Sequence, residues 1–370
     1  MNQEQLSLIA LHMVPGLGPV GIKNLISYCG SAEEVFKKNK ARLLKTPGIG
    51  PKTAEAILTP TTFDKAEAEI RNTEKQGAQI LFYYSKEYPD NLKQAIDAPL
   101  LLYYKGNITL QQPRNIAIVG TRQATDYGKK ITEELIEALA PYQPLIISGL
   151  AYGIDICAHK AALKYGLNTI GILGSGIDTI YPALHKETAQ KMLNQGGLLS
   201  EKPLGTKPEA YHFPERNRII AGMANLVIVV EAARKGGALL TAEIANSYDR
   251  EVMAVPGSLF ADHSEGCNHL IREQKAHIFT SVKDVEVLMN WPLSEDGEEK
   301  TPTKKHWQEG DFSSEEWRIV SLLQEHNKAL HIDELSWRTQ IPIHSVGSVL
   351  LQLEFKGCIK AQPGKMFALV

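Results

Sequence analysis

Cysteine is scarce in this chain, and its spacing excludes the common cysteine-based structures. The 370 residues include four cysteines that lie far apart: Cys29, Cys157, Cys267 and Cys358. A zinc ribbon needs close C-x-x-C pairs, and a disulfide framework needs many cysteines in a short chain. Glu231, Glu243 and Asp249 also have no His or Cys nearby at ligand spacing. We therefore predict no metal site and no disulfide, as in a protein of the reducing cytoplasm.

Long apolar runs and an excess of basic residues are missing as well. No stretch reaches the roughly 18 apolar residues of a membrane helix. The first residues, MNQEQLSLIALHM, carry Glu4 where a secretory signal would be basic. Lys and Arg number 40 against 42 Asp and Glu, for a formal net charge of −2. The sequence predicts a cytoplasmic protein with no membrane segment, in which any nucleic-acid site is local.

The fingerprints of common nucleotide cofactors are absent too. The apolar run NIAIVG at 115–120 is followed by TRQATDYG, which does not contain the G-x-G-x-x-G of dinucleotide-binding folds. The P-loop spacing G-x-x-x-x-G-K-[ST] is also missing, since Gly120 and Gly128 are too far apart and Lys129 is followed by Lys130. We expect no NAD, no nucleoside triphosphate and no other cofactor.

What the chain does contain is a repeated pattern of apolar strand, turn and helix from residue 115 to about 290. The strands are almost continuously apolar: NIAIVG, PLIISG, NTIGILG, GLLSE, NLVIVVEA and EVMAVPG. Such runs are typical of parallel strands that are covered on both faces. Helical segments alternate with them, so the pattern predicts an α/β fold with a Rossmann-like, doubly wound sheet.

A smaller repeat precedes this region. The segments VPGLGPVGIKNLI at 14–26 and TPGIGPKTAEAIL at 46–58 share two glycines that allow a tight turn between helices. This pattern resembles the helix-hairpin-helix motif and predicts a SAM-like domain. Such hairpins hold DNA phosphates in some proteins and only pack or contact other proteins elsewhere. With Lys23 and Lys52 as the only basic residues near them, both interpretations stay open.

The end of the chain predicts a winged helix. After a polar, charged stretch, three helical segments precede two short strands around a Pro–Gly turn. The candidate recognition helix, IHSVGSVLLQLEF, has only His344 where a major-groove helix would present Arg, Lys, Asn or Gln. A packing or protein-contact role is therefore favoured for it. The predicted boundaries are a helix-hairpin-helix domain, a Rossmann-like domain, a linker and a winged-helix domain at 1–76, 77–291, 292–312 and 313–370.

The candidate site lies where the parallel strands end. Ligands of open α/β sheets bind outside the carboxyl ends of the strands. Glycine-containing loops occur there: GTR at 120–122, SGLAYGID at 148–155 and GSGID at 174–178. PERNR at 214–218 opens a helix and adds two arginines, and each arginine can form a two-pronged contact with a phosphate. The alternative is that one arginine pairs with Asp155 or Glu201. His159, four residues after Asp155, is better explained by a buried structural hydrogen bond than by a catalytic pair.

Several motifs in a fixed order carry a family resemblance. They are VGTR, SGLAYGID-x3-H, GSGIDTIYP, LLSE, FPERNRIIAG, VVEA, LLTAEIA and AVPG, and the match spans about 80 to 280. Together they resemble the DNA-processing protein A family (DprA, also called Smf). The resemblance implies a single-stranded DNA-binding protein that delivers strands to a RecA-type recombinase in natural transformation, without catalysis. It also implies a DNA pocket that uses Arg122, Ser148 and Gly149, and the loop from Gly174 to Gly176.

Two departures from the family pattern are visible. GTR replaces the commoner GSR, and Lys235 to Ala238 replaces a Ser–Gly–Ser-type turn, which removes hydroxyl groups there. We expect binding that ignores base sequence, because phosphates are held while bases stack or face outward. Pairing of two subunits, as a homodimer, would extend a short groove. The predicted DNA-binding residues are Gly120, Arg122, Ser148, Gly149, Gly174, Ser175, Gly176, Arg216, Asn217 and Arg218.

One enzymatic alternative remains open. Nucleotide phosphoribohydrolases of the lysine-decarboxylase-like family have this kind of sheet and a PGGxGTxxE motif. The segment GGALLTAE keeps two glycines and places Glu243 at the matching distance. It lacks the leading Pro and the third Gly, and its Thr stands one residue late. The non-enzymatic interpretation is therefore favoured.

Overall fold

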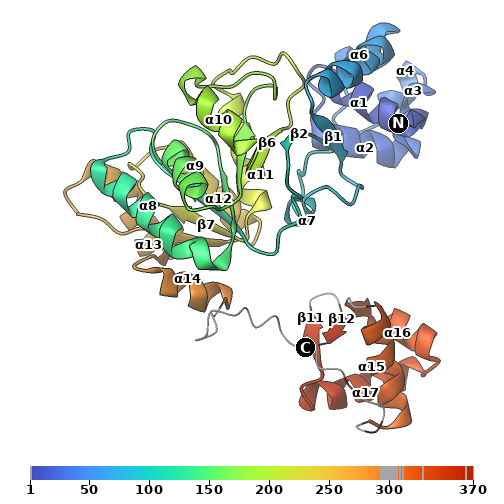
Figure 1. Ribbon diagram of the computed structural model, residues 1–370. Coiled ribbons are helices and arrows are strands. Elements are labelled where there is room, and N and C mark those ends of the chain that lie inside the picture. The colour runs from blue at the N-terminus through green and yellow to red at the C-terminus, as the bar shows by residue number, and fades with distance from the viewer. Residues whose placement is uncertain are drawn as a thin grey trace. The chain divides into compact units, whose positions relative to one another are not determined.

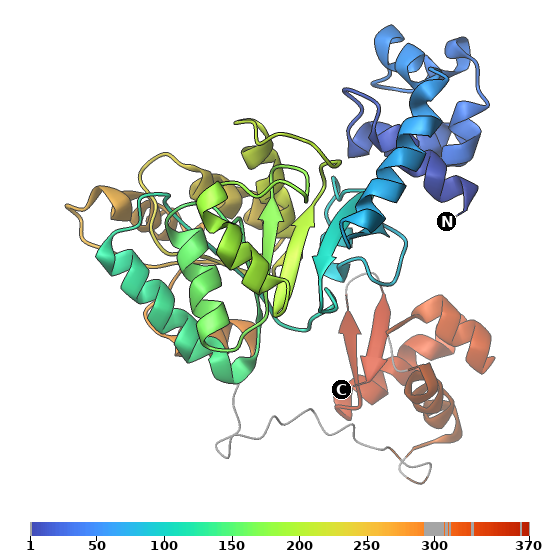
Figure 2. The same ribbon diagram turned by 45° about the horizontal axis from the view of Figure 1, so that its top comes forward.

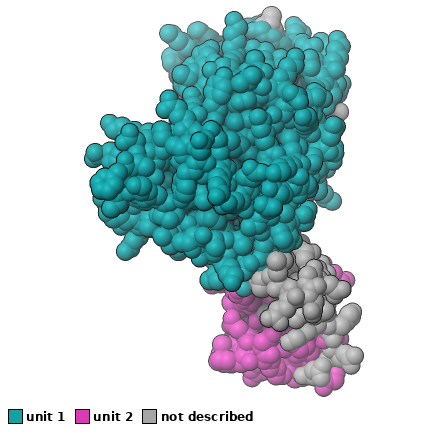
Figure 3. Space-filling view, turned by 60° about the vertical axis from the view of Figure 1, so that its left-hand side comes forward, with its two compact units in different colours: residues 1–292 teal, residues 293–370 magenta. Residues whose placement is uncertain are grey.

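The computed structural model describes residues 2–291, 307, 310, 312–326, 329–362 and 365–369. The chain forms two compact units, Met1–Pro292 and Leu293–Val370, which Figure 3 colours separately. The predicted linker at 292–312 lies almost entirely outside the described residues. The predicted boundary between residues 76 and 77 lies inside the first compact unit, so it stays a prediction.

The described part of the first unit contains a nine-stranded sheet with the order β1-β2-β6-β5-β4-β3-β7-β8-β9. From β6 to β9 all neighbouring strands are parallel, whereas β1 and β2 join antiparallel at one edge. The expected doubly wound sheet is confirmed, and all six predicted strands are present. The strands are β1 Gln79–Phe82, β2 Leu101–Gly106, β3 Asn115–Val119, β4 Leu145–Ser148, β5 Thr169–Leu173, β6 Gly196–Ser200, β7 Leu226–Val229, β8 Glu251–Ala254 and β9 His277–Ile278.

Helices cover both faces of this sheet because its strands carry apolar side chains on both sides. In β4, Ile146 packs into one core and Ile147 into the other. The first face holds α8 Asp126–Leu139, α9 Ile154–Lys164, α10 Lys186–Met192 and α14 Val282–Met289. The second holds α7 Asp90–Lys93, α11 His212–Met223, α12 Gly237–Ser247 and α13 Glu265–Arg272. Figure 1 shows α8 and α9 side by side on their face.

The N-terminal helices form the predicted helix-hairpin-helix pair. They are α1 Gln3–His12, α2 Pro19–Cys29, α3 Ala32–Phe36, α4 Lys40–Leu43, α5 Pro51–Ile57 and α6 Thr61–Lys75. Gly16 and Gly48 turn the chain with φ of 76° and 83°, a left-handed conformation that favours glycine. These helices share a core with β1 and β2, and Figure 2 shows them, in blue, beside that end of the sheet. Lys23, which is half-buried, donates to the Ile96 carbonyl over 3.0 Å.

The second unit is the predicted winged helix. Helices α15 Ser314–His326, α16 Ile332–Thr339 and α17 Ile343–Phe355 pack around their own core. Strands β10 Leu330–His331, β11 Ile359–Gln362 and β12 Met366–Leu369 form a small antiparallel sheet in the order β10-β12-β11. Across the residues described in both units, no helix is long and apolar enough to cross a bilayer.

Candidate nucleic-acid interface

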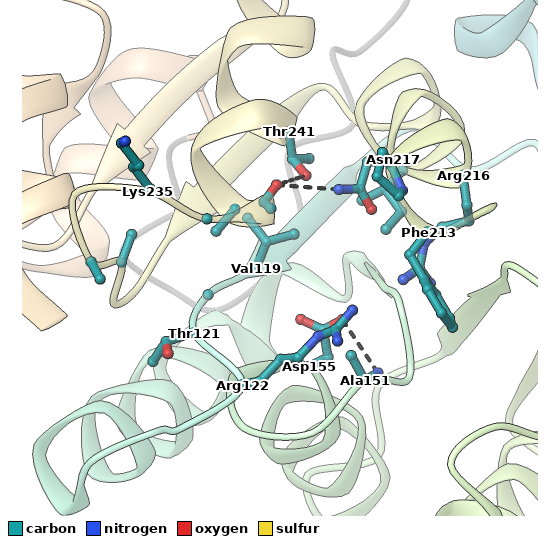
Figure 4. A pocket seen from close by; sticks show the side chains of 18 of the residues that line it. Val119, Thr121, Arg122, Ala151, Asp155, Phe213, Arg216, Asn217, Lys235 and Thr241 are labelled. Carbon is teal, nitrogen blue, oxygen red and sulfur yellow. Dashed lines mark hydrogen bonds between the residues drawn. The ribbon is translucent and has the colours of Figure 1, made fainter. Parts of the chain in front are cut away.

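The strand order reverses between β3 and β7. Successive strands β3, β4, β5 and β6 extend the sheet one way, and β7, β8 and β9 extend it the other way. The loops that leave β3 and β7 therefore diverge and leave a crevice at the carboxyl ends of these strands, which is the usual ligand position in such sheets. A pocket of about 340 Å³ lies there (Figure 4), lined chiefly by the loop after β3, the start of α11, and the segment from Ala232 to Thr241.

Arg122 is exposed in this pocket and is held by a rigid loop. The preceding Thr121 donates its N–H to the Glu231 carbonyl over 2.7 Å and accepts the Ile154 N–H over 3.2 Å. The Arg122 guanidinium lies over the Phe213 ring, 5.4 Å from its centre. Arg122 has no carboxylate partner in the part of the chain that the structure describes. The backbone and the aromatic ring therefore fix the position of the Arg122 guanidinium, and its charge remains available to an anion.

The start of α12 forms the opposite wall. Its N-cap residue is Gly236, which has no side chain to accept a hydrogen bond from the helix. The first backbone N–H groups of α12 therefore have no capping side chain. Asn217 and Thr241 both donate to the Gly237 carbonyl, over 3.2 and 2.9 Å, and hold this turn in place (Figure 4). Lys235 lies beside it and also lines the pocket. A helix N-terminus next to a lysine favours anions.

Arg216 lines the pocket but is a buried structural residue. It is 6% exposed and donates from Nη1 to the carbonyls of Gly149, over 2.6 Å, and Ile172. Burial lowers the pKa of Arg216 to about 10, while nearby Asp155 opposes that shift. The pKa of the Asp155 carboxyl is raised by its burial, although it accepts the Gly149 N–H over 3.1 Å and Arg216 opposes the rise. The predicted phosphate contact of Arg216 is therefore not supported by its surroundings.

Arg218 points to another part of the molecule. Its Nη2 contacts both carboxylate oxygens of Glu201 at 2.5 Å, and its Nη1 donates to the Asp97 carbonyl over 2.6 Å. Its side chain is 13% exposed and does not line the pocket. The sequence also allowed that one of these arginines pairs with Asp155 or Glu201. Arg218 forms the pair with Glu201, and Arg216 lies beside Asp155. Arg218 is thus a structural ion pair, and its predicted role in the groove needs revision.

The remaining predicted residues use their polar groups within the fold. Ser148 is buried and donates to the Ile118 carbonyl over 2.6 Å, and Ser175 donates to the Thr179 carbonyl over 2.7 Å. The Gly176 N–H bonds the Thr206 carbonyl over 3.0 Å. Of the predicted set, the residues that line the pocket are Gly120, Arg122, Arg216 and Asn217. DNA contact by Ser148, Gly149, Gly174, Ser175 and Gly176 stays a prediction.

Gly149 and Gly174 have a packing role. A Cβ on Gly149 would lie 2.4 Å from Arg216 Nη1, and one on Gly174 would lie 3.1 Å from the Phe213 ring. Their missing side chains let α11 approach the sheet, so they position the two residues that border the pocket. Phe213 and Lys235 are pocket residues that the sequence prediction missed. The sequence contains the motifs that hold these residues, FPERNR and KGGA. Neither motif shows which way its side chains point in the fold.

His159 makes the expected structural hydrogen bond. Its Nδ1 lies 2.7 Å from Thr169 Oγ1, and the Thr169 hydroxyl donates to the Ile146 carbonyl over 2.9 Å. Because that hydroxyl hydrogen is used, His159 Nδ1 must be the donor. Burial lowers the pKa of His159 to about 3, so the ring is neutral at pH 7. Asp155 bonds backbone N–H groups, so no catalytic pair forms.

Comparison with known proteins agrees with this geometry. The family model for DNA recombination-mediator protein A matches residues 79–290. The chain belongs to this family. The DprA winged helix domain matches residues 301–365, and the SAM-like helix-hairpin-helix tandem matches residues 8–59. All three domain types expected from the sequence are thereby confirmed.

Relatives from several bacteria show the same membership. The chain is 32% identical to Protein Smf of Synechocystis over 99% of both chains. It is 44% identical to the DNA processing protein DprA of Streptococcus pneumoniae, over 54% of this chain and 70% of the relative. The crystal structure of that S. pneumoniae protein matches with a TM-score of 0.66 at 33% identity, covering 78% of this chain and 98% of the other.

A second similar structure is described by the ligand that its protein binds. DNA processing protein A of Helicobacter pylori matches with a TM-score of 0.53 at 29% identity, covering 58% of this chain and 96% of the other. That structure is described as showing a single-stranded DNA binding mode.

Proposed function

We propose that the chain binds single-stranded DNA without reading its sequence, along the crevice at the ends of β3 and β7. The observation that carries this is the exposed Arg122, held over Phe213 in a pocket that the uncapped start of α12 also lines. Cationic side chains and free backbone N–H groups suit phosphates, and an aromatic ring beside them suits a base. The described binding mode of the H. pylori relative supports the same class of ligand.

The physical mechanism follows from how these groups are arranged. Arg122 and Lys235 contact phosphates from two sides of the pocket, while the first N–H groups of α12 add donors. Phe213 offers a stacking surface, and the 45% exposed Tyr181 lies 5.6 Å from it between ring centres. Every base has a π face, and every nucleotide has a phosphate, so these contacts tolerate any sequence.

We also infer that this protein holds DNA rather than reacts with it. The phosphoribohydrolase alternative needs Glu243 at a nucleotide, but that residue is exposed on α12 and is not among those that line the pocket. Release of free base from a nucleoside monophosphate is the assay that distinguishes the two. The finer role, delivery of strands to a RecA-type recombinase during natural transformation by a homodimer, is part of the proposal and is supported by the family.

The first test compares single-stranded with duplex DNA. We expect single strands to bind at least roughly tenfold more tightly, about 1.4 kcal/mol. The reason is that the Phe213 ring in the crevice is expected to stack on an unpaired base, which duplex DNA does not offer. The logarithm of the association constant should fall linearly with the logarithm of salt, by about 0.7 per phosphate contacted. A mobility shift over a salt series measures both, and equal affinity for a blunt duplex would rule out the proposed ligand.

A second test asks which unit holds the DNA. A chain that ends after Trp291 should remain folded, because the winged helix has its own core and the sheet's cores lie within the first unit. It should keep affinity for single strands within about threefold of the full chain. Fluorescence anisotropy with a labelled oligonucleotide at one salt concentration measures this. A loss of more than about tenfold, or 1.4 kcal/mol, in the folded protein would place the site in the winged helix.

A further inference from the structure

Arg122 also borders a second, open hollow. This hollow has a volume of about 480 Å³ and is lined by the loop after β3, the turn before α9, and residues near the starts of α8 and α9. Apart from Arg122, none of the residues that line it belongs to the pocket at β3 and β7. The same exposed guanidinium therefore stands beside two neighbouring sites.

The hollow is formed where two loops meet at Gly153. This glycine has a φ of 77°, and a Cβ placed on it would lie 2.1 Å from the Thr121 carbonyl oxygen and 2.8 Å from the Arg122 Cα. Only glycine allows the turn before α9 to come this close to the loop after β3. The position of the hollow relative to Arg122 is thus fixed by backbone contacts.

Tyr152 supplies an exposed aromatic ring in the hollow. It is 45% exposed, and its ring meets the His185 ring at 72°, with 5.1 Å between the ring centres. His185 is buried, and its Nδ1 lies 2.8 Å from the Leu150 carbonyl oxygen, so Nδ1 is the donor. The Tyr152 ring is therefore supported from inside the protein and open to solvent, as a ring that stacks on nucleic-acid bases must be.

Positive charges surround this ring. Arg122 and Lys129 line the hollow, and Lys160 is exposed on the face of α9 that carries Cys157. Burial raises the pKa of the Cys157 thiol, whereas the charges of Lys129 and Lys160 oppose that rise, so both ammonium groups act on the hollow. Lys129 is paired with Asp126 over 3.0 Å, but both side chains are exposed, and a phosphate can replace so weak a partner.

The other carboxylates near Cys157 are already bonded elsewhere. Buried Asp155 accepts backbone N–H groups of the loop after β4. Glu133 lies 2.5 Å from Lys164, which is near the far end of α9. The cations of the hollow therefore keep most of their attraction for an anion.

We propose that this hollow binds a second nucleotide of the same DNA strand, with its base on Tyr152 and its phosphate between Arg122 and Lys129. The inference rests on the proposed function and extends it. One base stacks on Phe213, a neighbouring base stacks on Tyr152, and the strand passes Arg122 between them. An aromatic ring beside cations suits any nucleotide, so this second site does not read sequence either.

The natural cysteines provide the first test in the unaltered chain. Cys157 lines the hollow, Cys29 is also partly exposed but belongs to the N-terminal helices, and Cys267 and Cys358 are buried. Burial raises the pKa of both partly exposed thiols, so their labelling by a maleimide is compared at one mildly alkaline pH. With a thymidine oligonucleotide at about ten times its dissociation constant, labelling of Cys157 should slow about tenfold, because only free protein reacts. Labelling of Cys29 should not change.

Substitutions in the hollow provide the second test. Tyr152→Ala should weaken binding of the oligonucleotide by about five- to a hundredfold, the usual effect of losing one stacked base, without changing the salt dependence. Tyr152→Trp should bind like the parent, because it keeps an aromatic face. Lys129→Ala should instead reduce the salt slope by about 0.7, which corresponds to one phosphate of a single strand. Fluorescence anisotropy over a salt series measures both quantities.

The other end of α9 offers matched controls. There the Lys164 ammonium lies 5.0 Å from the centre of the Tyr165 ring, the same pair of residue types outside the hollow. Tyr165→Ala and Lys164→Ala, with folding checked by circular dichroism, should leave affinity and salt slope unchanged.

Three results would overturn the inference. They are equal labelling of Cys157 with and without DNA, equal protection of Cys29, and Tyr152→Ala binding no more weakly than Tyr165→Ala. If Arg122→Ala still weakens binding in those cases, the site at β3 and β7 stands and only the second nucleotide site is wrong. If the parent chain does not bind single strands, both proposals fail.

Discussion

Replacing Arg122 with alanine is expected to weaken single-stranded DNA binding by about ten- to a hundredfold, or roughly 1.5–3 kcal/mol, the usual worth of a charge-assisted hydrogen bond. Arg122 is an exposed cation of the pocket with no carboxylate partner among the described residues, and its loop is already held by Thr121. Arg122→Lys should restore only part of the affinity, since lysine lacks the planar fork. Fluorescence anisotropy at fixed salt provides the dissociation constants.

Arg234→Ala is the matched control for this substitution. It removes the same charge from a neighbouring loop, but Arg234 is 80% exposed and lies outside the residues that line the pocket. Its effect should be a small, salt-dependent change without loss of the site. If folded Arg122→Ala binds like the parent, or if both alanine variants lose affinity equally, the crevice at β3 and β7 is not the DNA site.

Replacing Arg216 with alanine should instead unfold the protein more easily. The change leaves the buried Asp155 charge without its cation and leaves the carbonyls of Gly149 and Ile172 without a donor. Each buried carbonyl left without its donor costs about 1–3 kcal/mol, so the unfolding free energy should fall by roughly 2–6 kcal/mol. Urea denaturation followed by circular dichroism measures this loss. Any accompanying loss of DNA binding would then follow from a disturbed pocket wall rather than from a lost phosphate contact.

Lys202→Ala controls for the removal of an ion pair at the surface. Lys202 lies 2.7 Å from Glu215, and that carboxylate side chain is 50% exposed. Exposed pairs contribute at most about 1 kcal/mol. If Arg216→Ala destabilises the fold no more than Lys202→Ala, and mainly reduces DNA affinity, then Arg216 acts on the ligand as the sequence first indicated.

Arg216 and Arg218 show where sequence reasoning reached its limit. Two residues apart on α11, they must point in different directions, because residues at i and i+2 do not share a helix face. Which one faces the pocket depends on how α11 lies on the sheet. Arg216 bonds Gly149, just after β4, and Ile172 within β5, whereas Arg218 meets Glu201 and Asp97. None of those partners is adjacent in sequence, so the pattern PERNR could not distinguish a buried cation from a free one.

The strands, their glycine turns, the flanking helical domains and the family could be predicted from the amino-acid sequence, because apolar periodicity and motif order are local properties of the chain. The sequence also places Arg122 at the end of a strand. The folded structure was needed to show that Ser148 points into the sheet, that Phe213 lies beneath Arg122, and that Lys235 and the start of α12 line the pocket. These outcomes depend on the reversal of strand order between β3 and β7, which brings together segments about a hundred residues apart.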